Sequence, residues 1–131
     1  MLTNKYQSCS LSDNERKALY RRLVELVERE QLYLNPILKL KDLAIRLKTN
    51  TRYLSVAINV ENGGNLMNFL NNYRIEEVKK KLSTMNRGKG SLTLYGIALT
   101  CGFRNKATFY KVFKDLAEIT PLDYMNDKSL N

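Results

Sequence analysis

The break at Gly102, between two short segments of helical apolar periodicity, most constrains the fold of this chain. Before the break, Ile97 and Ala98 place small apolar bulk at the end of one predicted helix. Glycine adopts the positive φ of a tight turn more readily than other residues. Beyond it, Asn105 is a good N-cap for a second helix. That helix has apolar residues at spacings of three and four, namely Phe109, Val112, Phe113 and Leu116. Two short helices across such a turn predict a helix-turn-helix.

The opposite side of the second helix is basic and polar, with Lys106, Tyr110, Lys111 and Lys114. The whole chain of 131 residues carries 22 Lys and Arg against 13 Asp and Glu, a net charge of +9. A field of this sign attracts polyanions, of which nucleic acid best suits a helix-turn-helix. Charge alone leaves membrane surfaces and acidic proteins as alternatives.

The same pattern occurs earlier, between Leu40 and Asn59. Leu43, Ala44 and Leu47 predict a short amphipathic helix, and Asn50 can cap a second helix that begins at Thr51. On that second helix, Leu54, Ala57 and Ile58 are expected to face inward. Its outward side is expected to carry Arg52, Ser55, Val56 and Asn59.

These residues resemble a known family. The second motif carries Ile97-Ala98, Gly102-Phe103, Phe109, Phe113-Lys114, Thr120-Pro121 and Tyr124, and the first motif and the helix after it carry Leu43-Ala44, Tyr53-Leu54-Ser55, Phe69 and Tyr73-Arg74-Ile75. This register resembles the DNA-binding domain of AraC/XylS-type transcriptional regulators, over about residues 38 to 124. Arg74 lies where the family usually has arginine. We expect it to have a structural role, with hydrogen bonds across the seam between the subdomains, in preference to the alternative of a DNA contact.

The chain departs from the family pattern at several positions. Lys48 stands where the first turn usually has glycine, and Glu118 where a glycine usually precedes the Thr-Pro pair. Val78 replaces a small residue, and Met125 stands where a basic residue is common. Glu118 is strained if its backbone keeps a positive φ.

We therefore predict an all-α fold with two helix-turn-helix subdomains, a long linker helix and an extra N-terminal amphipathic helix. Ser12 and Glu15 predict a capping box at the start of that N-terminal helix. The predicted parts are a linker or truncation end (1–11), the N-terminal scaffold helix (12–34), the first helix-turn-helix (35–64), the linker helix (65–85), the second helix-turn-helix (86–126) and a tail (127–131).

A linker helix of roughly twenty residues spans about 30 Å, close to the ~34 Å pitch of B-DNA. It is expected to hold two recognition helices in successive major grooves. Outward residues near the start of each recognition helix are expected to contact bases: Arg52, Ser55, Val56 and Asn59 in the first, and Lys106, Ala107, Tyr110 and Lys111 in the second. Phosphate contacts are expected from Arg104, Thr108 and Lys114.

Catalysis is not expected. The chain has no histidine, the most common general base, and Glu76 and Glu77 point about 100° apart on a helix, which excludes a catalytic dyad. Two cysteines are too few for a metal cluster, so we predict no metal and no cofactor. No apolar run is long enough to cross a membrane and no secretory signal is visible, so the expected location is the cytoplasm.

The predicted function is sequence-specific binding of double-stranded DNA, as the output module of a bacterial transcription regulator. The resemblance implies a sensor domain outside this segment, and regulation through contact with RNA polymerase or through dimerisation. The alternative is a basic helical interaction module that kept the fold but binds an acidic protein.

Overall fold

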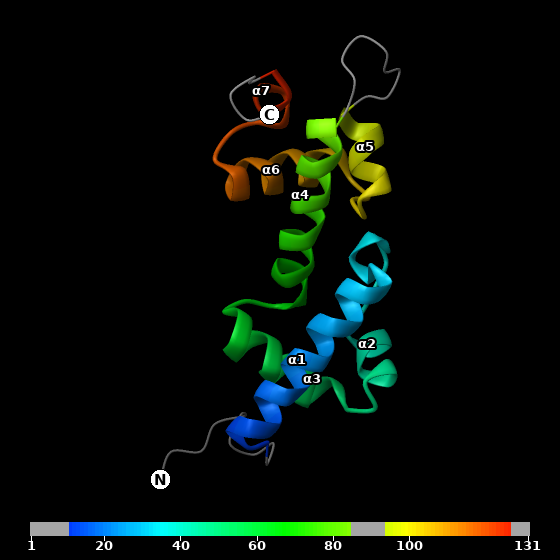
Figure 1. Ribbon diagram of the computed structural model, residues 1–131, viewed down its shortest axis with the longest axis vertical. Coiled ribbons are helices and arrows are strands. Elements are labelled where there is room, and N and C mark those ends of the chain that lie inside the picture. The colour runs from blue at the N-terminus through cyan, green and yellow to red at the C-terminus, as the bar shows by residue number, and fades with distance from the viewer. Residues whose placement is uncertain (1–10, 85–93, 127–131) are drawn as a thin grey trace. The chain divides into compact units, whose positions relative to one another are not determined.

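The computed structural model describes residues 11–84 and 94–126, and this part of the chain is entirely helical (Figure 1). The elements are α1 (Asp13–Glu30), a 3-10 turn (Leu32–Leu34), α2 (Leu40–Arg46), α3 (Thr51–Asn62), α4 (Leu66–Thr84), α5 (Leu94–Thr100), α6 (Lys106–Ala117) and α7 (Pro121–Asn126). Cys9, Arg87 and Lys89 lie outside the described residues.

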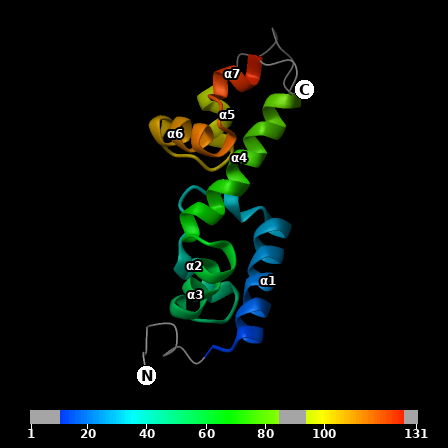
Figure 2. The same ribbon diagram turned by 90° about the vertical axis from the view of Figure 1, so that its left-hand side faces the viewer.

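The described residues form two compact units. The first comprises the residues up to Leu32 and Ile37–Phe69, and the second comprises Tyr33–Pro36 and the residues from Leu70 onward. In the first unit α1 lies beside α2 and α3, and in the second α5, α6 and α7 gather around α4 (Figures 1 and 2). The segment Tyr33–Pro36 thus belongs with a much later part of the chain. The predicted boundary between residues 34 and 35 did not anticipate this.

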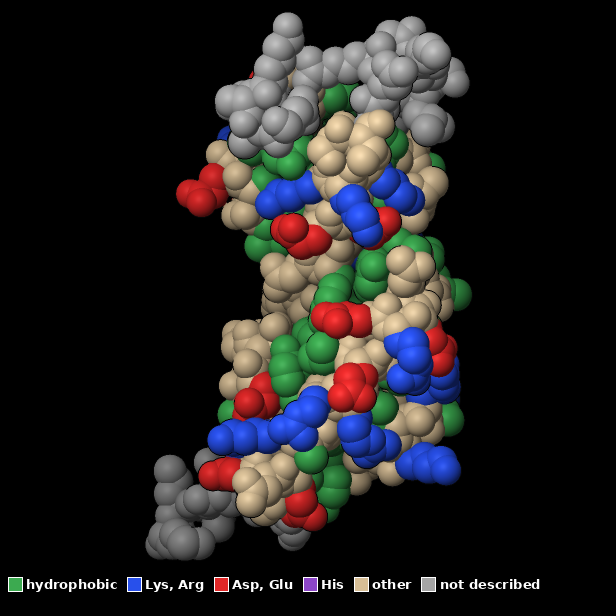
Figure 3. All heavy atoms as spheres, viewed as in Figure 1, with side chains coloured by type: hydrophobic (Ala, Val, Ile, Leu, Met, Phe, Trp, Pro, Cys, Tyr) green, Lys and Arg blue, Asp and Glu red, His purple; other side chains and the backbone are tan. Residues whose placement is uncertain are grey.

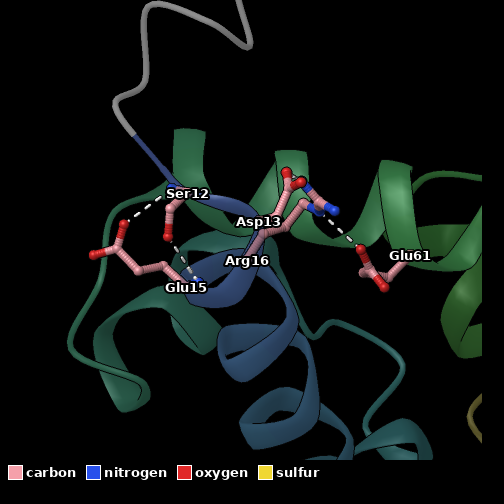
Figure 4. Close-up of polar contacts among 5 residues, drawn as sticks. All are labelled: Ser12, Asp13, Glu15, Arg16 and Glu61. Atoms are coloured by element: carbon pink, nitrogen blue, oxygen red, sulfur yellow. Dashed lines mark hydrogen bonds and ion pairs between the residues drawn. The ribbon is translucent and has the colours of Figure 1, made fainter.

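The N-terminal helix begins with the predicted capping box. The backbone N–H of Glu15 donates to Ser12 Oγ at 3.1 Å, and the Ser12 N–H donates to Glu15 Oε1 at 2.9 Å (Figure 4). These bonds satisfy two N–H groups that a helix start leaves free, and the bond from the Ser12 N–H to the carboxylate lowers the pKa of Glu15. The predicted stripe on α1 is buried: Leu19, Leu23, Leu26 and Val27.

The polar side of α1 predicts that Arg16 and Arg22 face water. Arg22 is exposed, as predicted, whereas Arg16 is half-buried, and both make bonds that were not predicted. Arg16 Nε donates to Glu61 Oε2 of α3 at 2.7 Å, and Arg16 Nη1 donates to Asp13 at 2.7 Å (Figure 4). The hydrogen bond and charge of Arg16 lower the pKa of Asp13. Arg22 Nη2 donates to the Leu47 carbonyl at 2.8 Å, just after α2. Sequence periodicity could not show this, because the partners come from distant positions.

An aromatic core fills the second unit. The Phe103 and Phe109 rings lie 5.3 Å apart, and Phe113 meets Phe109 and Tyr124 edge-on at 5.9 and 5.6 Å. The helical spacing of these phenylalanines predicts that they form core and do not stack on bases. All three are buried, which confirms this prediction. The core also contains Ile75, Val78, Leu82, Ile97, Ala98 and Cys101.

Arg74 is the main buried charge of the second unit, with 3% of its surface exposed. Its Nε donates to the Tyr33 carbonyl at 2.6 Å and its Nη2 donates to the Asn35 carbonyl at 2.9 Å. Burial lowers the pKa of the Arg74 guanidinium, which stays charged because its normal pKa is so high. Its predicted structural role is confirmed.

Apolar spacing predicts that Met67 lies on the buried side of the linker helix and Leu116 on that of α6, but both are exposed. Met67, in the first turn of α4, is 55% exposed, and Leu116, near the end of α6, is 44% exposed. Spacing identifies the side of a helix that faces a core, but it does not show how far along the helix the core extends.

Among residues 11–84 and 94–126, the non-glycine residues that adopt the left-handed conformation are Gln31, Lys48 and Glu118. Glu118 ends α6 with φ 62° and ψ 18°, and its N–H donates to the Lys114 carbonyl. Lys48 has φ 56° in the turn between α2 and α3. Both positions therefore keep the backbone for which glycine is usual, although a side chain is present.

We expect Glu118→Gly to stabilise the protein by about 1 kcal/mol, since glycine has no Cβ to strain this conformation. Thermal or urea unfolding measures the change. Glu118→Ala is the matched control, because it removes the same carboxylate but keeps the Cβ. If the glycine variant were no more stable than the alanine variant, backbone strain at Glu118 would be disproved.

A second comparison uses two glycines with positive φ, Gly63 at +83° and Gly102 at +99°. A Cβ at Gly63 would meet nothing within 4 Å, whereas a Cβ at Gly102 would clash with the Tyr33 carbonyl and lie 2.6 Å from Arg74 Nε. We expect Gly63→Ala to cost roughly 1 kcal/mol, and Gly102→Ala at least about 3 kcal/mol, in urea unfolding. Equal losses of stability in the two variants would show that the close packing around Gly102 does not contribute to stability.

Candidate nucleic-acid interface

The helix α3 is positioned by its cap and by the turn before it. Asn50 Oδ1 accepts from the Tyr53 N–H at 2.7 Å, and the Thr49 N–H donates to the Ala44 carbonyl at 3.0 Å. Leu54, Ala57 and Ile58 are fully buried, as predicted. This burial fixes which side of α3 faces solvent.

The outward side of α3 has three of its four predicted residues. Arg52 is exposed, and its guanidinium makes no hydrogen bond or ion pair within the described part of the chain. Ser55 and Asn59 are half-buried and lie one helical turn apart. Arg52, Ser55 and Asn59 follow one another at spacings of three and four, so they share one face.

The prediction that Val56 faces outward is wrong. Its side chain is 6% exposed and belongs to the buried residues of α3. It is therefore not available to pack on a thymine methyl group. Val56 lies beside Ala57 at the edge of the apolar stripe. The spacing of apolar residues in the sequence did not show where this stripe ends.

The helix α6 is held in the same way. Asn105 Oδ1 accepts from the Thr108 N–H at 3.0 Å, and Phe109 and Phe113 are fully buried below. Other predicted residues lie exposed on or just before the helix: Arg104, Lys106, Ala107, Thr108, Lys111 and Lys114. The helix α6 therefore has an exposed basic side, and its opposite side packs into the aromatic core of the second unit.

Tyr110 is less free than its neighbours. Its ring is half-buried, lies 5.3 Å from the Phe109 ring and packs on the core of the second unit. The Lys106 ammonium lies 5.9 Å from the Tyr110 ring centroid, within the range of a cation–π contact. Tyr110 thus contacts Lys106 through its ring, and only the outer part of the ring is exposed.

Lys111 pairs with Asp115 one turn later, at 2.9 Å between Nζ and Oδ2. The two side chains are 78% and 60% exposed, so solvent screens the pair and it is weak. A phosphate or base can therefore replace Asp115 as the partner of Lys111. Elsewhere acidic groups stand among the basic ones, as the face in Figure 3 shows.

The structure also has a depression of about 470 Å³ that sequence reasoning missed. It involves residues of the 3-10 turn, α4 and α7, among them Tyr33, Tyr73 and Tyr124. The Tyr33 and Tyr73 rings stack at 5.3 Å. No residue of α3 or α6 lines it, and no sequence signal links positions so far apart.

The described residues do not form a metal site or a membrane-spanning helix. Within residues 11–84 and 94–126, no group of three or more His, Cys, Asp or Glu side chains is arranged to hold a metal ion. In the same ranges, no helix has the length and apolarity needed to span a membrane. Burial raises the pKa of the Cys101 thiol, which disfavours a reactive thiolate.

Comparison with known proteins identifies the family. The family described as "Helix-turn-helix domain", of AraC type, matches residues 43–127, which is more than half of the chain. The chain belongs to the AraC-type helix-turn-helix family. None of the curated proteins matches the chain.

Solved structures show the same AraC-type fold. The C-terminal domain of AraT, a response regulator from Geobacillus stearothermophilus, matches with a TM-score of 0.68 and 24% identity, covering 89% of this chain and 87% of that one. The C-terminal domain of the two-component response regulator YesN from Fusobacterium nucleatum subsp. nucleatum ATCC 25586 matches with a TM-score of 0.61 and 25% identity, covering 86% and 99%.

A protein of unknown function from Listeria innocua is also similar, with a TM-score of 0.67 and 25% identity over 81% of this chain and 93% of that one. As a member of the AraC-type family, the present chain is a DNA-binding domain of a transcription regulator. Its helix pairs α2–α3 and α5–α6 are the two helix-turn-helix motifs of that fold.

Proposed function

We propose that this domain binds double-stranded DNA in a sequence-specific way by placing α3 and α6 in two successive major grooves. The observation that carries the proposal is that α3 and α6 are both capped helices with a buried apolar side and an exposed polar side. The major groove of B-DNA admits an α-helix, and its base edges present distinct patterns of donors and acceptors.

On α3, Arg52 is the proposed principal base contact. It is exposed near the N-terminus of the helix, where a recognition helix contacts base edges, and it has no competing partner among the described residues. A guanidinium can donate two parallel hydrogen bonds to O6 and N7 of guanine. Ser55 and Asn59 extend the same face by two turns.

On α6, Lys106 and Lys111 are the proposed donors to bases, with Ala107 available for a thymine methyl group and Tyr110 at the edge of the contact. Arg104, Thr108 and Lys114 are proposed to contact phosphates, since all three are exposed around the start or on the outer side of α6. Such contacts set the position of the protein on the duplex.

The length of α4 supports the proposal of two adjacent grooves. Its 19 residues span about 28 Å at 1.5 Å per residue, which is of the order of the ~34 Å that separates successive major grooves. The similarity to C-terminal domains of response regulators supports a role as the output part of a regulator. We propose that a second domain and contact with RNA polymerase control its action.

Selection of bound sites from a pool of random duplexes tests the proposed function. We expect a bipartite motif whose halves lie about ten base pairs apart. Failure to enrich any sequence would contradict the proposal. Displacement of a selected duplex by an acidic protein, with no preference among duplex sequences, would instead favour an interaction module.

Two arginines test how sequence is read. Arg52→Ala should remove about 1–3 kcal/mol of discrimination at one base pair and relax the preference there. Arg104→Ala should weaken binding to all sequences alike and reduce the slope of log affinity against log salt by about one. Titrations at several salt concentrations measure both. If Arg52→Ala weakened every sequence equally, Arg52 would be a phosphate contact.

A further inference from the structure

Ser55 and Asn59 form a side-chain pair on the exposed side of α3. Asn59 Nδ2 donates to the Ser55 carbonyl at 2.8 Å and to Ser55 Oγ at 3.2 Å. Both residues are half-buried, at positions one helical turn apart. The bond to the Ser55 carbonyl fixes the orientation of the Asn59 amide, because a flipped amide would place its oxygen against that carbonyl oxygen.

This orientation leaves Asn59 with one kind of free atom. An asparagine amide has two N–H donors and one carbonyl acceptor. The amide nitrogen of Asn59 donates to both oxygens of Ser55, and no described residue donates to Asn59 Oδ1. Asn59 therefore presents an acceptor alone, whereas an asparagine that reads adenine uses one donor and one acceptor together.

The four bases differ in what they offer to such an acceptor. In the major groove, adenine and cytosine present amino groups at N6 and N4, and guanine and thymine present carbonyl oxygens at O6 and O4. A carbonyl acceptor can accept a hydrogen bond from the first two and is repelled by the last two.

We propose that Asn59, held by Ser55, distinguishes amino bases from keto bases at one position of the DNA site. The proposal rests on the proposed function of α3 as a major-groove reader. Ser55 acts as a positioning residue. It engages the amide nitrogen of Asn59, so that Asn59 Oδ1 can accept a hydrogen bond from the amino group of adenine or of cytosine. Its own hydroxyl hydrogen remains available to a neighbouring acceptor.

The experiment uses the full chain and duplexes derived from the selected site, with each base pair in turn replaced by the other three. Wild type is compared with Asn59→Ala and Ser55→Ala. Ser83→Ala is the control, since Ser83 is a helical serine of α4 whose hydroxyl donates to the Lys80 carbonyl and which takes no part in the proposed base contacts. Thermal melting confirms that each variant is folded.

For wild type we expect one position at which adenine and cytosine bind within about twofold of each other and guanine and thymine bind about tenfold more weakly. Asn59→Ala should reduce the differences among the four bases at this position to about threefold or less. Ser55→Ala frees one amide hydrogen, so adenine should gain about threefold over cytosine. Ser83→Ala should leave all ratios unchanged.

Specific binding with a keto base preferred at the position sensitive to Asn59→Ala would overturn the inference, as would an unchanged ratio of adenine to cytosine in a folded Ser55→Ala variant. The same holds if Asn59→Ala altered no position. In these cases the proposed function stands. Absence of sequence preference in wild type would overturn the proposed function itself, so the two failures are distinguishable.

Discussion

The buried guanidinium of Arg74 is the interaction on which the second unit depends. A charge removed from water must be hydrogen-bonded, and Arg74 obtains its bonds from the carbonyls of Tyr33 and Asn35. These bonds attach a segment that precedes the first helix-turn-helix to the helix that follows it. Gly102 approaches the same place so closely that only a residue without Cβ fits. One arginine thus fixes both a distant segment and the turn before α6.

Arginine also joins helices in the first unit, where Arg16 connects α1 to Glu61 of α3 and Arg22 bonds to the chain just after α2. These cations are used in the architecture and are not simply part of a positive surface. The net charge of +9 therefore overstates what is free to meet DNA. Among the exposed cations that make no hydrogen bond or ion pair within the described residues are Arg52 on α3 and Lys106 and Lys114 on α6.

Both α3 and α6 follow an asparagine cap, and the turn before α3 and the end of α6 hold left-handed residues. Lys48 and Glu118 adopt this conformation without the glycine that is usual in the family. Their surroundings therefore impose the turn at some cost in backbone strain. The geometry of the helix-turn-helix is conserved here by packing and capping, although the residue best suited to it is missing.

The sequence by itself predicted the N-terminal helix, the linker helix and the helices of both helix-turn-helix motifs, because caps such as Ser12, Asn50 and Asn105 and apolar periodicity act within a few residues. It also identified most of the outward residues. It did not predict α7 or the 3-10 turn. Tertiary structure decided what depends on distant partners: the burial of Val56, the exposure of Met67 and Leu116, the bonds of Arg16 and Arg22, and the pairing of Tyr33 with Tyr73. Periodicity gives the side of a helix, whereas only packing shows what covers each position along it.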